Sequence, residues 1–213
     1  MKRRGFTLIE LLIVVAIIGI LAAITVLNYR DAQIRTKISR SKVDVHALTV
    51  AIEQLRMDKD VLLIDCMDCQ RYGKEARQRI EDAFSGVGHD MSLPRPAVDM
   101  LSPLTSPVSY LNALPRDPLA PIDWVGVVGW RVTPFYYYFD NDPAFPGIDH
   151  WDLWWPYPLS EGEYTILGCG PAEVETYSSN NTIIPYDATN GLVSMGDIVT
   201  KSSGGNVQVK FAP

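Results

Sequence analysis

Cysteine and excess positive charge are both scarce in this sequence. Three cysteines among 213 residues exclude a small domain held together by a dense set of disulfides. The net charge of -6 argues against general binding to nucleic-acid backbones, which requires a dominant basic surface, so no nucleic-acid partner is expected. Only one segment is long and apolar enough to span a bilayer, which excludes a channel or transporter with several spans.

The apolar segment covers residues 6–27 and follows a short basic leader. It reads FTLIELLIVVAIIGILAAITVL and would form a helix of about 33 Å, enough to cross a hydrocarbon core of about 30 Å. A secretory signal peptide has a shorter apolar run, of about 7–15 residues. Lys2, Arg3 and Arg4 are the only charges before the segment. We therefore expect one membrane span, with the N-terminus in the cytoplasm.

One carboxylate, Glu10, interrupts the apolar segment close to its start. An ionised side chain costs about 2–3 kcal/mol at the centre of a bilayer and less near its edge. A plain membrane anchor gives no reason to keep it, so Glu10 is a candidate functional residue that needs a partner. The alternative is that Glu10 lies at the headgroup edge without one.

The junction between the leader and the apolar segment carries a family resemblance. Residues 5–10 read GFTLIE, and with the basic leader they resemble the signal of type IV pilins and type II secretion pseudopilins. The resemblance implies cleavage between Gly5 and Phe6 by a prepilin peptidase, methylation of the new Phe6 amine, and retention of the apolar segment. We expect Glu10 of one subunit to pair with the Phe6 amine of a neighbour, which would offset the desolvation of both charges and fix their register.

Residues 28–60 contain neither proline nor glycine and continue the helical pattern. Spacings of four and three predict one buried stripe with a single polar position, made of Ile34, Ile38, Ser41, Val45, Leu48, Ile52 and Leu55. The pattern predicts one helix over about 6–58, with its first half in the membrane and its second half packed on a domain. An isolated coiled-coil dimer is the weaker alternative, because the pattern covers fewer than four heptads.

A basic stretch lies just beyond the apolar segment, and its residues are Arg30, Arg35, Lys37, Arg40 and Lys42. Two interpretations remain open. The stretch is either an ordinary solvated helix face, or a surface that contacts lipid head groups or the acidic faces of neighbouring subunits.

The remaining chain predicts a globular α+β domain of pilin-like type, in which the long N-terminal helix packs on a small antiparallel sheet. We expect a second helix over 73–84 and strands over 124–132, 135–139, 164–169, 192–194 and 207–211. Residues 110–118, YLNALPRDP, resemble the pseudopilin segment that precedes the sheet. The predicted organisation is a leader (1–5), a membrane and filament-core helix (6–27), its amphipathic continuation (28–60) and a periplasmic domain (61–213).

Two groups of residues are candidates for further chemistry. Cys66 and Cys69 form a C-x-x-C pair, for which we expect a local disulfide or loop tether; a bridge from one of them to Cys169 is the alternative. The segments 164–171 and 186–198 resemble the late loop that calcium orders in many pseudopilins. That resemblance implies calcium ligands at Asp187, Asn190, Ser194 and Asp197. Turns and helix caps are the other interpretation of these four residues.

Catalytic motifs are missing from the sequence, so we expect a structural protein and not an enzyme. The resemblance implies a filament subunit of the type II secretion pseudopilus, which assembles from the inner membrane to drive protein secretion. Its implied partners are copies of itself, the prepilin peptidase, the inner-membrane assembly platform with its ATPase, and minor pseudopilins. A type IV pilin for adhesion, twitching or DNA uptake is the first alternative. A membrane-tethered periplasmic enzyme or sugar-binding module is the second.

Overall fold

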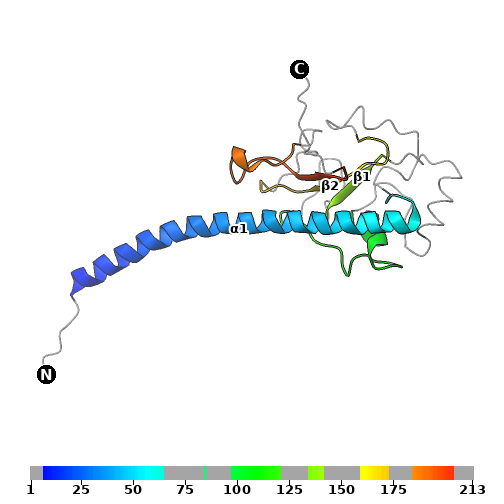
Figure 1. Cartoon of the computed structure of the whole chain (residues 1–213). Coiled ribbons are helices and arrows are strands. Elements are labelled where there is room, and N and C mark those ends of the chain that lie inside the picture. Colours follow the sequence, from blue (N-terminus) through cyan, green and yellow to red (C-terminus); the bar gives the residue numbers. More distant parts are fainter. Residues whose placement is uncertain are drawn as a thin grey trace, which may run out of the picture.

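A long helix and a small sheet make up the architecture (Figure 1). The computed structural model describes residues 7–64, 84, 97–120, 134–141, 159–172 and 184–203. The helix is α1 (Leu8–Lys59), and three strands, β1 (Tyr137–Asp140), β2 (Tyr164–Gly168) and β3 (Ile198–Lys201), form an antiparallel sheet in the order β1-β2-β3. The second half of α1 lies along this sheet, and its first half extends away from the domain. The predicted α+β fold is confirmed.

The bounds of α1 follow from its residues. Thr7 caps its start, and Asp60 ends it in the left-handed conformation, with a φ of 55° and its N–H donating to the carbonyl of Arg56. No proline or glycine between residues 28 and 60 interrupts the backbone hydrogen bonds. Within the ordinary uncertainty of helix ends, the single helix predicted over about 6–58 is confirmed.

The predicted stripe is the face that α1 packs on the domain. Ile34 is partly buried, and the other six members of the stripe are buried together with Ala51. Their core partners include Tyr138, Tyr164 and Ile166 from the sheet. This burial, worth about 1.5–3 kcal/mol for each large apolar side chain, attaches the helix to the domain.

Two short segments, which follow α1 and precede the strands in the sequence, also contribute to this core. They are α3 (Ala97–Leu101) and the 3₁₀-helix η2 (Ser102–Leu104), which appear in green beside α1 in Figure 1. Leu101 and Leu104 are completely buried and belong to the same apolar cluster as the α1 stripe. The core therefore extends beyond the contact between helix and sheet.

Hydrogen bonds from two tyrosines also tie α1 to the sheet region. The Tyr136 hydroxyl donates to Ser41 Oγ at 3.2 Å, and the Tyr164 hydroxyl donates to Glu53 Oε1 at 2.9 Å. Burial raises the pKa of both tyrosines, so both hydroxyls stay protonated and able to donate. The one polar position of the stripe, Ser41, is thus the acceptor for a buried hydroxyl.

Residues 110–118, the segment that resembles pseudopilins, contact the sheet through Arg116 and Asp117. Arg116 forms a β-bridge with Phe135, and the Asp117 carboxylate accepts hydrogen bonds from the N–H groups of Cys169 at 2.6 Å and Leu119 at 2.9 Å. Burial raises the pKa of Asp117, although these N–H donors oppose the rise. A Cβ atom at Gly168 would lie 2.7 Å from the Tyr136 ring, so there is no room for a side chain at this position of β2.

The strand predictions have mixed outcomes. Those over 135–139 and 164–169 are confirmed by β1 and β2, although Phe135 forms only an isolated bridge before β1. The strand over 192–194 is wrong, because that segment is a turn and β3 begins only at Ile198. Gly191 and Gly196 have φ values of 110° and 144°, and these glycine conformations break the extended backbone on both sides.

The other elements predicted in this region lie outside the described residues. They are the strands over 124–132 and 207–211 and almost all of the helix over 73–84. Phe84 is described, and it is helical and buried.

Replacing one residue of the buried stripe tests how α1 holds the domain. Leu48 is completely buried, so Leu48→Ala should reduce the free energy of unfolding by about 2–5 kcal/mol, through lost burial and the cavity left behind. Val50, two residues further along α1, is 44% exposed, and Val50→Ala should cost less than about 1 kcal/mol. Denaturant unfolding of the detergent-solubilised chain measures both. Equal losses would contradict the packing described here.

Candidate processing and assembly site

The start of α1 is organised by a reciprocal pair of side chains, Thr7 and Glu10. Thr7 donates to Glu10 Oε2 from its N–H at 2.8 Å and from its hydroxyl at 2.7 Å, and the Glu10 N–H donates back to Thr7 Oγ1 at 3.3 Å. This is a capping box, in which two backbone donors at a helix start are satisfied by side chains. Thr7 was not among the residues predicted from the sequence, although the T-x-x-E spacing signals this cap.

Glu10 therefore has hydrogen-bond partners within its own chain. Its carboxylate is held back toward the residue that precedes α1, which is the side on which the predicted cleavage lies. Gly5 and Phe6, the two residues of the predicted cleavage, lie outside the described residues. The predicted pairing of Glu10 with a neighbouring Phe6 amine stays a prediction.

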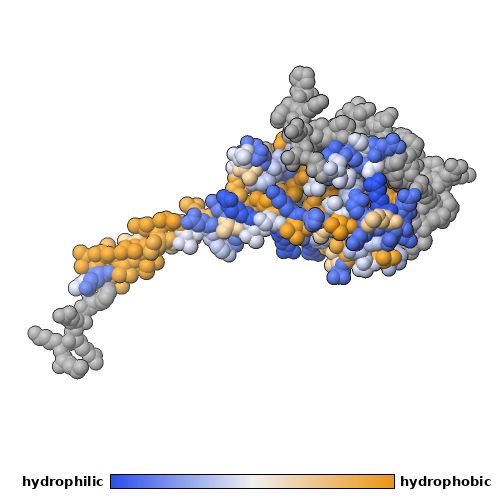
Figure 2. Space-filling model, in the orientation of Figure 1, coloured by the Kyte–Doolittle hydropathy of each residue, from blue (hydrophilic) through white to orange (hydrophobic). Residues whose placement is uncertain are grey.

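The first half of α1 exposes its apolar side chains. The large apolar residues between Leu8 and Leu27 are 45–80% exposed, and they form the orange half of the helix in Figure 2. Within the described chain, α1 is the one helix long and apolar enough to cross a membrane. A continuous apolar surface of this size requires a cover of lipid or of other apolar helices.

A basic belt separates this apolar half from the domain. Its residues, Arg30, Arg35, Lys37, Arg40 and Lys42, are all exposed, and the surface turns blue between the orange half and the domain in Figure 2. Arg40 lies 3.7 Å from Asp44 on the next turn, a contact of small energetic value because Arg40 is largely exposed. The exposure of the belt fits both interpretations of these residues: a solvated helix face, or a surface that contacts lipid head groups or neighbouring subunits.

The two segments that resemble the late loop of pseudopilins, 164–171 and 186–198, lie together in the structure. The backbones of Gly170 and Gly196 touch so closely that a Cβ atom on Gly170 would overlap the Gly196 carbonyl oxygen. Asp197 is buried beside them, and its backbone pairs with Ile184 and Tyr186. The two segments therefore form one folded unit.

Three of the four predicted calcium ligands lie at the surface or partly exposed on this loop: Asp187, Asn190 and Ser194. Asp187 caps the 3₁₀-helix η3 (Ala188–Asn190) by accepting from the N–H and hydroxyl of Thr189, both at 2.8 Å, and these bonds lower its pKa. In the described part of the chain, three or more His, Cys, Asp or Glu side chains nowhere gather as a metal would require. Calcium binding stays a prediction, because Asn and Ser oxygens would complete the set.

Of the three cysteines, only Cys169 lies in the described part of the chain, and it is buried at the end of β2. Cys66 and Cys69 lie outside that part, so their predicted disulfide is untested.

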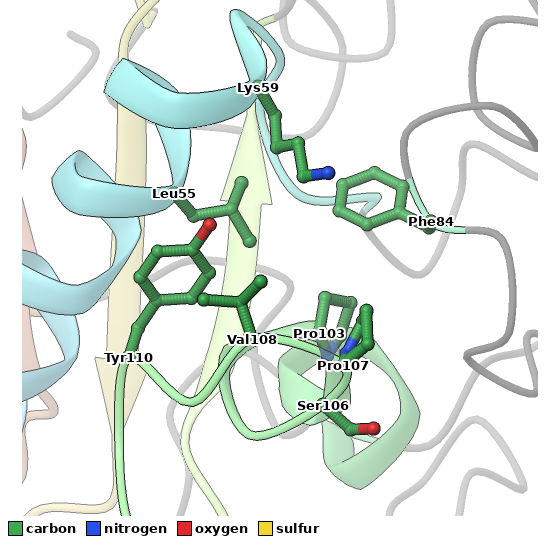
Figure 3. A pocket seen from close by; sticks show the side chains of 8 residues that line it. All are labelled: Leu55, Lys59, Phe84, Pro103, Ser106, Pro107, Val108 and Tyr110. Atoms are coloured by element: carbon green, nitrogen blue, oxygen red, sulfur yellow. The ribbon is translucent and has the colours of Figure 1, made fainter.

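A small cavity lies where α1 ends (Figure 3). Leu55, Phe84, Val108 and Tyr110 help to line it, and the Lys59 side chain extends toward the Phe84 ring. Its volume of about 10 Å³ is about what one water molecule needs. The cavity is a packing gap, too small for a substrate or cofactor.

Comparison with known proteins finds one family match and several relatives. The family described as the prokaryotic N-terminal methylation motif matches residues 1–26. The chain is 52% identical over 59 residues to the type IV major pilin protein PilA of Myxococcus xanthus, covering 28% of this chain and 27% of that protein. It is 57% identical over 51 residues to a fimbrial protein of Pseudomonas aeruginosa, covering 24% and 33%.

A third relative, the type IV major fimbrial protein FimA of Dichelobacter nodosus, is 48% identical over 56 residues, covering 26% of this chain and 36% of that protein. The chain thus spans about a quarter to a third of the length of these curated relatives. No solved structure matches it.

The capping box predicts a local effect of Thr7. Thr7→Ala removes both hydrogen bonds of the Thr7 hydroxyl, at a cost of about 1 kcal/mol, so the amides of the first turn of α1 should exchange with solvent several-fold faster in detergent micelles. Thr25→Ala is the matched control, because the Thr25 hydroxyl donates to the Leu21 carbonyl within the helix and caps nothing. Hydrogen exchange followed by NMR measures both. Unchanged exchange in Thr7→Ala would contradict a capping role.

The two interpretations of the late loop predict different responses to calcium. If calcium binds there, millimolar calcium should raise the melting temperature of the purified chain by several degrees relative to chelator, and Asp187→Ala should abolish the rise. If the residues only form turns and caps, calcium should leave the melting temperature unchanged. Thermal unfolding with calcium and with chelator decides between them.

Proposed function

Since this chain is type IV pilin-like in its N-terminal signal and in its helix-on-sheet fold, we propose that it is a subunit of a type II secretion pseudopilus. The single observation that carries the proposal is the continuity of α1. One unbroken helix exposes an apolar surface over its first half and buries a stripe in the domain over its second half. Such a helix can join a filament core at one end and carry a folded domain at the other.

The proposed mechanism is mechanical and involves no catalysis by this chain. Prepilin peptidase cuts between Gly5 and Phe6, and the subunit waits in the inner membrane with its domain in the periplasm. An assembly platform with its cytoplasmic ATPase then extracts subunits into a helical filament. The apolar halves of α1 pack together in the filament core, in place of lipid, and growth of the filament pushes cargo outward. Minor pseudopilins are the proposed additional partners.

The Thr7–Glu10 pair gives the Glu10 carboxylate hydrogen-bond partners before the subunit joins a filament. Thr7 bonds to the Glu10 carboxylate in the single chain, which reduces the cost of holding that carboxylate beside lipid. In the filament, the Phe6 amine of a neighbour would supply a full opposite charge. A charged partner in apolar surroundings stabilises the carboxylate more than neutral donors do, so the pair would favour the assembled state.

Two observations bear on the kind of filament. Residues 110–118 resemble pseudopilins and are held in the sheet by Arg116 and Asp117, which supports the secretion pseudopilus. The relatives named type IV major pilin and fimbrial protein support the second candidate, a surface pilus. Their similarity is confined to about a quarter of this chain, so these names weigh less.

A deletion strain tests which filament the chain serves. We expect the extracellular proteome to lose secreted proteins while the count of surface pili stays at the wild-type level. Restoring the gene should recover both readouts. Loss of pili with an intact secretome would replace the pseudopilus with a type IV pilus.

Glu10 provides the test of the filament mechanism itself. Glu10→Ala should leave cleavage by the peptidase intact and reduce filaments at least tenfold, because the Phe6 amine loses its partner. Glu161→Ala is the control, since Glu161 is an exposed carboxylate in the turn before β2. Cleavage is read from the mobility of the chain and assembly from sheared filaments. Normal filaments from Glu10→Ala would overturn the mechanism and favour a membrane-tethered enzyme or binding module.

A further inference from the structure

Beyond the membrane half, α1 carries a second apolar surface that the domain leaves uncovered. Tyr29, Val43, Val50 and Met57 are 63%, 67%, 44% and 77% exposed. We propose that this surface is a contact site for another copy of the chain, so that subunits touch along α1 outside the membrane half as well. The inference rests on the proposed filament function and deepens it.

The exposed residues form one narrow line along α1, which drifts by about 20° per heptad around the helix and which we call the outer stripe. Its members follow at every seventh position: Tyr29, Thr36, Val43, Val50 and Met57. Seven residues make almost two full turns, so these side chains lie above one another. Val50 is two residues, or about 200°, from the buried Leu48. The outer stripe is therefore opposite to the face that packs on the sheet.

The outer stripe is free of charge although α1 is rich in charged residues. The positions that fill the gaps between its members are Ala32, Ser39, Ala47 and Gln54, and three of them are small enough to let another helix approach closely. On the helical wheel, Arg35 and Lys42 lie to one side of this uncharged strip and Arg40 to the other. This arrangement, apolar in the centre and charged at the edges, is typical of a helix–helix contact.

The threonine hydroxyls on this face make burial less costly. The Thr36 hydroxyl donates to the Ala32 carbonyl at 2.8 Å, and the Thr25 hydroxyl, about three turns earlier in the apolar half of α1, donates to the Leu21 carbonyl at 2.7 Å. A hydroxyl that already donates within its own helix loses little when a partner displaces water. The outer stripe could therefore be covered without stranding these donors.

Lipid cannot be the cover of the whole outer stripe. Val50 lies 23 residues beyond Leu27, or about 35 Å along the helix, which exceeds the thickness of the hydrocarbon core itself. The same heptad positions continue toward the N-terminus as Leu8, Val15 and Ala22. A helix packed against that apolar half in a filament can follow the same face outward without meeting a charge.

Charge along α1 also favours a second copy that is shifted along the axis. Residues 28–42 carry five basic side chains and one acidic, and residues 43–60 carry four acidic side chains and two basic. Parallel copies in register would oppose like charges, whereas an axial shift brings the basic belt of one copy beside the acidic half of the next. The proposed filament would need an axial shift of this kind between neighbouring copies.

Placing a charge on the outer stripe tests the contact in cells that express the full chain. Val50→Glu should leave cleavage and the melting temperature of the detergent-solubilised chain unchanged, because Val50 is half exposed, and should reduce filaments at least tenfold. Val108→Glu is the matched control, because Val108 is 45% exposed on the domain, and it should assemble normally. Wild-type filament yield from Val50→Glu would overturn the inference. Absence of filaments from the wild type would instead refute the proposed function.

A photo-reactive side chain identifies the occupant and does not depend on the charge variant. Val43→benzoylphenylalanine, irradiated in assembled filaments, should yield a dimer of the chain, with the crosslink mapped by mass spectrometry to α1 of the second copy. A crosslink to a different protein, or no crosslink from filaments of normal yield, would overturn the second copy as occupant. If Val50→Glu loses filaments only because it unfolds, this crosslink alone decides.

Discussion

The whole molecule depends on the burial of one helix face against the sheet. The stripe from Ile38 to Leu55 is the main apolar contact between α1 and the described part of the domain, and the residues of α1 before Ile34 are exposed. Burial of this stripe joins α1 and the sheet in one apolar core. A sheet needs an apolar face that is covered, for example by a helix, to be stable, and α1 supplies much of the described core.

A single helix serves two environments because its two halves differ in pattern and not in backbone. The first half is apolar on every side, as a membrane or a bundle of like helices requires, and the second half is apolar on two opposite faces. The basic belt marks the change between them. Without a proline or glycine in between, force on one end passes to the other, which is what an extracted filament subunit would need.

Specific polar contacts accompany the apolar packing in the described part of the domain. Ser41 and Glu53 accept from tyrosines, and Asp117 accepts from two backbone N–H groups. Each satisfies a buried donor that would otherwise cost about 1–3 kcal/mol. The bonds to Ser41 and Glu53 fix the rotation of α1 on the domain, and the bonds to Asp117 fix the segment around Asp117 against the end of β2. Apolar packing alone would specify these orientations less strictly.

The sequence by itself determined what depends on neighbours along the chain: the membrane half, the single long helix and its buried face, since a period of 3.6 residues places those side chains together wherever the helix lies. Two of the strands were also predictable from their β-branched and aromatic residues. Tertiary structure decided the rest. The segment 192–194, expected to be a strand, is a turn, and β3 begins only at Ile198. The reason is that Gly191 and Gly196 adopt positive φ in a loop packed on Gly170. The acceptor role of Ser41 required Tyr136, 95 residues away, and no local pattern encodes a partner at that distance.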